Sequence, residues 1–139
     1  MTSAPIPIRV RFADTDAMGV AYYGTYLAWL ETARVETMRA VGLLYGDLTA
    51  RGLHSPVVEA NVRYKQPAHL DDLLEIDAWI AEVGKAQFSF DYELKRPSDD
   101  TLIATAHTKH ACVDAQTMRP TRLPDWLATA LEGLTRHGR

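Results

Sequence analysis

The chain has 139 residues, of which 47% are apolar and 24% charged, and its formal net charge at pH 7 is −3. This length predicts one domain over residues 1–139 that folds without disulfides or a structural metal, and the negative charge argues against a general affinity for nucleic acid. The lone cysteine, Cys112, cannot form an internal disulfide, so we expect a packed thiol in a cytoplasmic protein. Residues 1–8 lack a basic leader and no apolar run reaches about 18 residues. We therefore expect that the protein is neither exported nor membrane-spanning.

The first half of the chain predicts a strand followed by a helix. Residues 6–12 alternate between apolar and basic side chains, with Phe12 on the apolar side, so we expect a half-buried strand that ends near Asp14. From residue 25 to 41 the apolar spacing changes to three and four, which predicts a helix capped by Gly24 or Thr25. Leu27 lies on its main apolar stripe. Trp29 and Val35 lie off that stripe, so we expect the helix to be deeply buried.

The second half predicts mainly strands. Extended segments are expected at 56–64, 73–83, 86–95 and 101–114, and the turns at 84–85 and 97–100 make the last three a meander. Residues 46–52 predict a loop or a short helix. Residues 125–134 predict a short C-terminal helix with Pro124 in its first turn. The fold class is α+β, with a five-stranded antiparallel sheet around a long central helix. Because such a sheet leaves apolar edges, a homo-oligomer is expected.

The junction between the first strand and the helix predicts chemistry. Residues 14–26 read DTDAMGVAYYGTY, which places carboxylates directly before a helix N-terminus. Unpaired backbone N–H groups there polarise an acyl carbonyl, while an aspartate attacks it or activates water. Asp16 is the leading candidate for that aspartate. The residues alone leave open a solvated turn or a helix-capping carboxylate.

Residues 11–34, RFADTDAMGVAYYGTYLAWLETAR, resemble the signature of the 4-hydroxybenzoyl-CoA thioesterase family of hotdog-fold acyl-CoA thioesterases. Residues 62–76 and 119–124 are similar to later segments of that family, so the likeness spans nearly the whole chain. The resemblance implies hydrolysis of an acyl-CoA thioester without cofactor or metal. It assigns Asp16 as nucleophile or general base and the backbone N–H of Tyr23 as the group that polarises the carbonyl.

The resemblance also implies where substrate binds. Gly19 would let the backbone turn close to the substrate and Tyr22 would line the acyl pocket, while Tyr26 is an equally good core residue. Substrate contacts are assigned as well to Gly24, Val58 and Lys85. Lys85 is the one cation retained in the turn where the family's type member clusters basic residues, which leaves an acyl carrier protein open as an alternative to CoA. The family resemblance predicts a homodimer that pairs into a homotetramer, with active sites at the subunit interface.

Other functions fit the residues less well. A calcium loop starting at Asp14 would place Met18 at a ligand position and Thr25 where a bidentate Glu is required. His107 and His110 point to opposite faces of a strand and cannot share a metal. His54 could approach the active site across a dimer interface. A non-catalytic acyl-CoA-binding module is the main alternative, whereas a hotdog dehydratase would need a histidine near the helix start.

Overall fold

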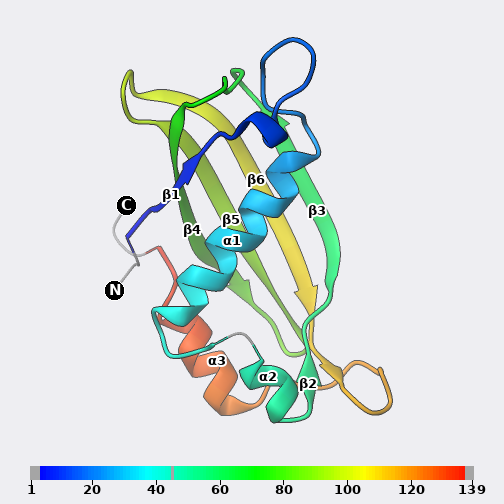
Figure 1. Ribbon diagram of the computed structural model, residues 1–139. Coiled ribbons are helices and arrows are strands. Elements are labelled where there is room, and N and C mark those ends of the chain that lie inside the picture. Colours follow the sequence, from blue (N-terminus) through cyan, green and yellow to red (C-terminus); the bar gives the residue numbers. More distant parts are fainter. Residues whose placement is uncertain (1–3, 45, 137–139) are drawn as a thin grey trace.

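The computed structural model describes residues 4–44 and 46–136, so the predicted absence of a leader falls partly on residues outside this range. Its centre is a five-stranded antiparallel sheet with the strand order β1-β4-β5-β6-β3 (Figure 1). The strands are β1 (Ile6–Arg9), β3 (Val57–Tyr64), β4 (Leu73–Val83), β5 (Gln87–Arg96) and β6 (Thr101–Ala111). The strands β4, β5 and β6 form the expected meander, and β3 is an edge strand.

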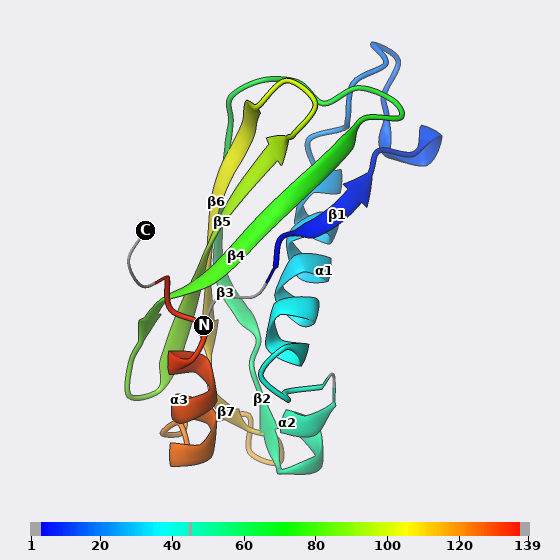
Figure 2. The same cartoon turned by 90° about the vertical axis from the view of Figure 1, so that its left-hand side faces the viewer.

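One long helix, α1 (Thr25–Arg39), lies across one face of this sheet, and two short helices lie at its lower end (Figure 2). These are α2 (Asp47–Ala50) and α3 (Asp125–Glu132), whose N-cap is Pro124. The predicted α+β hotdog arrangement is confirmed. None of the described helices is long and apolar enough to span a membrane.

The last predicted strand, 101–114, is not continuous. The strand β6 ends at Ala111, and a separate strand β7 (Val113–Asp114) pairs with the short strand β2 (Leu53–His54). Cys112 lies between β6 and β7, where its N–H donates to the carbonyl of Ala86 and its own carbonyl accepts from Thr121. The thiol of Cys112 is fully buried, as expected, and burial raises its pKa.

The core lies between α1 and the helix-facing side of the sheet. Alternate residues of the central strands supply its apolar side chains, as the period of a strand requires. They include Leu74, Ile76, Ile80, Phe88, Phe90, Tyr92 and Leu94. The helix contributes Tyr26, Trp29, Leu30 and Ala33, so Trp29 is buried as expected. Leu27 is 51% exposed, because α1 rests on the sheet through only one side, and its expected burial was wrong.

The first strand is shorter than its alternating pattern predicts. β1 ends at Arg9, and a 3-10 turn, η1 (Phe12–Asp14), follows it. The carboxylate of Asp14 accepts hydrogen bonds from the backbone N–H and the guanidinium of Arg11, which folds the chain back on itself. Phe12 is consequently turned outward and is 81% exposed, so its predicted place on the buried side of a strand was wrong.

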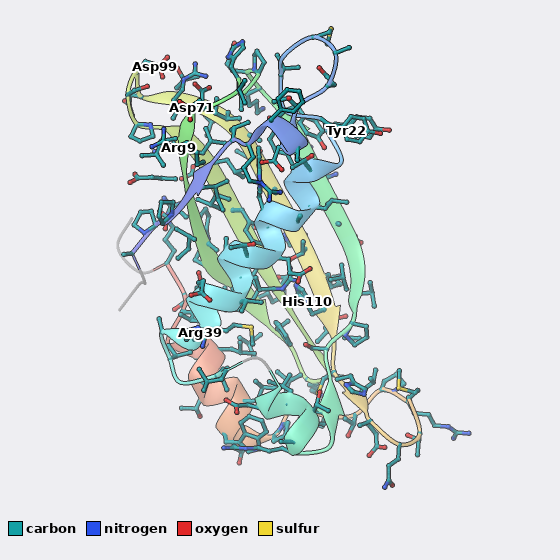
Figure 3. All side chains as sticks on the ribbon, viewed as in Figure 1. Arg9, Tyr22, Arg39, Asp71, Asp99 and His110 are labelled. Carbon is teal, nitrogen blue, oxygen red and sulfur yellow. The ribbon has the colours of Figure 1, made fainter. Side chains whose placement is uncertain are left out.

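A buried polar chain runs between the sheet and α1. His110 is 1% exposed on the helix-facing side of β6 (Figure 3), and its Nε2 lies 2.8 Å from Oγ1 of Thr108. That hydroxyl lies 2.7 Å from the Tyr92 hydroxyl, which accepts from Arg34 of α1 at 3.3 Å. Burial, reinforced by the charge of Arg34, lowers the pKa of His110 from 6.5 to about 4. His110 is therefore uncharged at neutral pH.

We expect His110 to make stability sensitive to acid. Between pH 6.5 and about 4 the unfolded chain binds a proton at His110 that the folded chain does not, so stability falls as the pH is lowered through this window. The loss reaches up to about 3 kcal/mol for a shift of this size. Urea unfolding of the wild type and of His110→Gln at pH 7, 5.5 and 4.5 measures it. Equal pH dependence in both proteins would contradict the assignment.

Candidate active site

The two junction aspartates have different surroundings. Asp14 is buried, and its hydrogen bonds and ion pair with the Arg11 guanidinium lower the pKa of its carboxyl group. Its backbone carbonyl accepts from the N–H of Tyr22 and from the hydroxyl of Thr25 at the start of α1. Asp14 therefore ties η1 to α1.

Asp16 lies in the tight loop that connects η1 to α1. Its backbone N–H donates to the carbonyl of Val20 at 2.9 Å, and its carbonyl accepts from Gly19, which adopts the left-handed conformation with φ 77°. The turn therefore uses the freedom of glycine at position 19. The Oδ1 atom of Asp16 accepts from the N–H of Met18 at 2.8 Å, while Oδ2 has no hydrogen-bond partner among the described residues. One oxygen fixes the half-buried side chain and the other remains available.

The start of α1 presents backbone donors. Its N-cap is Gly24, one of the two predicted caps, and no side chain caps it. Within the described part of the chain, no hydrogen bond uses the N–H of Tyr23 or of Gly24. The carbonyl of Tyr22 accepts from Thr25 at 2.9 Å and so orients the peptide unit that carries the Tyr23 N–H. This helix end therefore offers two oriented donors, with the positive end of the helix dipole behind them.

Tyr64, which was not among the predicted site residues, fixes the second of these peptide units. Its hydroxyl donates to the carbonyl of Tyr23 at 2.9 Å, and that carbonyl belongs to the same peptide unit as the Gly24 N–H. The Tyr64 ring meets Tyr26 edge to face at 4.9 Å between centroids. Tyr26 itself is 3% exposed and belongs to the core. No sequence signal links Tyr64 to this site, because the two are joined only by the approach of β3 to α1.

The Tyr22 ring points away from the body of the protein beside the start of α1 (Figure 3). It packs against the Tyr23 ring, with 4.5 Å between centroids. A Cβ atom on Gly24 would lie 2.9 Å from the Tyr22 ring, so glycine at position 24 leaves room for this ring. Tyr22 and Tyr23 are both largely exposed and form an aromatic surface next to Asp16.

Two predicted substrate contacts lie far from Asp16 within one protomer. The loop that carries Asp16 lies at the upper end of the sheet, whereas Val58 and Lys85 belong to segments at the lower end (Figure 1). The backbone carbonyl of Lys85 accepts from Leu123 near α3. Val58 lies near the beginning of edge strand β3 and is 57% exposed. The fold of one chain therefore does not bring these residues to Asp16.

A cavity of about 490 Å³ lies beside the second half of α1. Its walls come from α1, from α2 with the preceding loop, and from residues 53–56, which include His54. His110 is not one of the residues that line this cavity, and it does not share a metal site with His107. The His107 ring instead contacts Asp91 at 2.6 Å on the outer face of the sheet, so the two histidines face opposite sides as predicted. Among the described residues no three His, Cys, Asp or Glu side chains cluster as metal ligands.

The model of the thioesterase-like superfamily matches residues 10–131 of the chain. The chain belongs to this superfamily. The match contains the Asp16 loop, α1 and every strand of the sheet except β1. The predicted family relationship is thereby confirmed.

Relatives of this thioesterase are similar over most of their length. The acyl-CoA thioester hydrolase YbgC of Escherichia coli O6:H1 is 36% identical over 85% of this chain and 87% of its own. The 1,4-dihydroxy-2-naphthoyl-CoA hydrolase of Synechococcus elongatus is 36% identical over 85% of this chain and 90% of its own. The crystal structure of DHNA-CoA thioesterase from Staphylococcus aureus superposes with a TM-score of 0.86 at 30% identity, covering 96% and 91% of the two chains.

Proposed function

We propose that this thioesterase hydrolyses acyl-CoA thioesters, with Asp16 as the catalytic carboxylate and the backbone N–H groups of Tyr23 and Gly24 as the oxyanion site. One observation carries the proposal. A carboxylate with an unpaired oxygen and two unpaired, oriented backbone donors lie on the same short connection into α1. Relatives named as acyl-CoA thioester hydrolases support CoA as the carrier.

The geometry suits thioester cleavage. A thioester carbonyl is weakly stabilised by resonance and its thiolate leaves readily, so a carboxylate and an oxyanion site suffice without a serine nucleophile. Negative charge that develops on the carbonyl oxygen is stabilised by the Tyr23 and Gly24 donors, and one such donor contributes about 3 kcal/mol in other enzymes. Asp16 acts by attacking the carbonyl carbon or by taking a proton from an attacking water. Thiol release from a panel of acyl-CoAs tests the reaction, and a wild type that hydrolyses none would refute it.

The active unit is a homodimer built on the free edge of β3. Among the described residues no strand pairs with that edge, and Val57 and Val58 leave apolar surface on it. Antiparallel pairing of two copies over the length of β3 sets the start of one strand against the end of the other. Val58 and Lys85 of the second copy then lie at the same end as Asp16. This explains how residues that are distant in one chain serve one substrate.

The buried, unpaired thiol of Cys112 is consistent with a reducing compartment, and we place the enzyme in the cytoplasm.

Pairing of two such dimers gives the homotetramer. Light scattering measures the assembly directly. A strictly monomeric protein at micromolar concentration would contradict the shared site.

Tyr64 positions the oxyanion site in this proposal. Tyr64→Phe removes the hydroxyl that holds the Tyr23 carbonyl and leaves the Tyr26 ring contact in place. We expect kcat/KM to fall by about tenfold, the size of effect that follows loss of a hydrogen bond worth roughly 1.4 kcal/mol. Thermal stability should change little, because Tyr64 is 48% exposed. Steady-state kinetics with a melting curve separates the two effects, and unchanged kcat/KM would remove Tyr64 from the site.

A further inference from the structure

The cavity beside α1 has a lining that is about equally polar and apolar and includes one arginine. Apolar side chains from α1 and from the segments around α2 form part of its lining, including Val35, Met38, Leu43, Leu48, Leu53 and Met118. Arg34 also lines it, half-buried near the middle of α1. A guanidinium that is partly removed from water is usually paired with a carboxylate.

Arg34 has no carboxylate partner in the described part of the chain. It takes part in none of the salt bridges formed within residues 4–44 and 46–136. Its guanidinium donates one hydrogen bond, to the Tyr92 hydroxyl. Glu31, one turn earlier, lines the same cavity, but it is exposed to water and does not pair with Arg34. Further along the helix, Arg39 pairs with Glu36 and is not part of the cavity. Among the described residues the guanidinium of Arg34 therefore forms no ion pair, although the Glu31 carboxylate lines the same cavity.

The buried polar chain holds Arg34 in place. The Tyr92 hydroxyl that contacts Arg34 is itself fixed by Thr108, and Thr108 is fixed by His110. His110 is further hydrogen-bonded to the backbone of Ser55, a residue of the cavity wall. The side chains of Tyr92, Thr108 and His110 are uncharged at neutral pH, so they orient the Arg34 guanidinium without neutralising its charge. Arg34 is preorganised to receive an anion.

We propose that Arg34 selects acyl groups that carry a carboxylate at the end remote from the thioester. A carboxylate accepts two parallel N–H bonds from a guanidinium and neutralises its charge, which a neutral hydroxyl does not do. The inference rests on the proposed function and names the substrate class of the same site.

The proposed dimer supplies the route to Arg34. Within one chain Arg34 lies eleven residues beyond Tyr23 on α1, a rise of roughly 16 Å. In the β3 dimer the cavity of one copy, which is walled by His54 and Pro56 just before β3, opens next to the end of β3 and the α1 start of the other. An acyl group held at one helix start therefore enters the cavity of the second copy.

Two acyl-CoAs of equal chain length test this selection. Adipoyl-CoA carries a terminal carboxylate and hexanoyl-CoA ends in a methyl group. We expect the wild type to have a kcat/KM at least about tenfold higher for adipoyl-CoA, the size of effect of one charged hydrogen bond. Arg34→Gln should abolish this preference by lowering kcat/KM for adipoyl-CoA at least about tenfold more than kcat/KM for hexanoyl-CoA, while Arg39→Gln, on the same helix outside the cavity, should retain it.

If Tyr92 positions the Arg34 guanidinium, its substitution provides a second test of the selection. Tyr92→Phe should raise KM for adipoyl-CoA and leave KM for hexanoyl-CoA unchanged, whereas a merely structural defect would change both. Equal kcat/KM for the two substrates in the wild type, or an equal loss of both in Arg34→Gln, would overturn the inference. Calorimetric Kd values for both ligands on the slowly hydrolysing Asp16→Asn protein measure the same selection separately from turnover. Failure of the catalytic proposal is thereby distinguished from failure of the Arg34 proposal.

Discussion

Asp16→Asn is expected to lower kcat/KM for acyl-CoA hydrolysis by about a thousandfold, the middle of the range for removal of a catalytic acid–base group. The amide retains an oxygen that can accept from the Met18 N–H at the Oδ1 position, so the loop should remain folded. It cannot attack the thioester or accept a proton from water. The melting temperature should stay close to that of the wild type, and the Kd for a slowly hydrolysed acyl-CoA should change by no more than a few-fold. Thiol release and calorimetry measure these quantities.

Asp71→Asn is the matched control for this experiment. Asp71 is an exposed carboxylate in the loop next to the Asp16 turn, where Leu70 donates to the carbonyl of Gly19. It adopts a positive φ of 70°, which asparagine tolerates. Its substitution should leave kcat/KM within about twofold. If Asp16→Asn behaves like Asp71→Asn, Asp16 is not catalytic, and retained ligand affinity without turnover in the wild type would favour an acyl-CoA-binding module.

Val58→Asp is expected to dissociate the dimer and reduce kcat/KM by at least about a hundredfold. Each introduced carboxylate replaces an apolar side chain that pairing of the two β3 edges would bury, and a charge buried without a partner opposes association. Each active site then loses the wall supplied by the second copy. The isolated fold should survive, because Val58 is 57% exposed and contributes little to the core. Light scattering, circular dichroism and thiol release on one preparation measure assembly, folding and activity.

Leu73→Asp controls for the introduced charge. Leu73 is a partly exposed apolar side chain on β4, which is an interior strand of the sheet. Its substitution should leave the oligomeric state unchanged. A Val58→Asp protein that stays oligomeric and fully active would show that the subunits do not associate through this edge.

Local patterns predicted much of the fold because they act over short distances. The period of three and four identified α1 with its cap at Gly24, and the alternating strands identified β4, β5 and β6. The same alternation misplaced Phe12, because the bonds from Arg11 to the Asp14 side chain turn the chain before the pattern ends. Apolar spacing also placed Leu27 in the core, although the side of α1 that meets the sheet is decided by packing.

The candidate site divides in the same way. Its local part, the Asp16 turn with Gly19 and the start of α1, is contiguous in sequence and was predicted. The sequence placed two aspartates in this segment, and the structure gives them different surroundings, since Asp14 is occupied by Arg11 while one oxygen of Asp16 is unpaired. Tyr64 was missed because it reaches Tyr23 across 41 positions of sequence.

The amino-acid sequence by itself determined the fold class, the family and the strand-to-helix junction, because these follow from hydrophobic periodicity and from a contiguous motif. Tertiary structure alone decided which helix-end donors are held by Tyr64, which cavity receives Arg34, and that Val58 and Lys85 lie at the far end of the sheet from Asp16. Those features arise from the packing of α1 on the sheet and from the pairing of distant strands. Such contacts depend on how separate elements meet, and no local pattern of residues encodes that meeting.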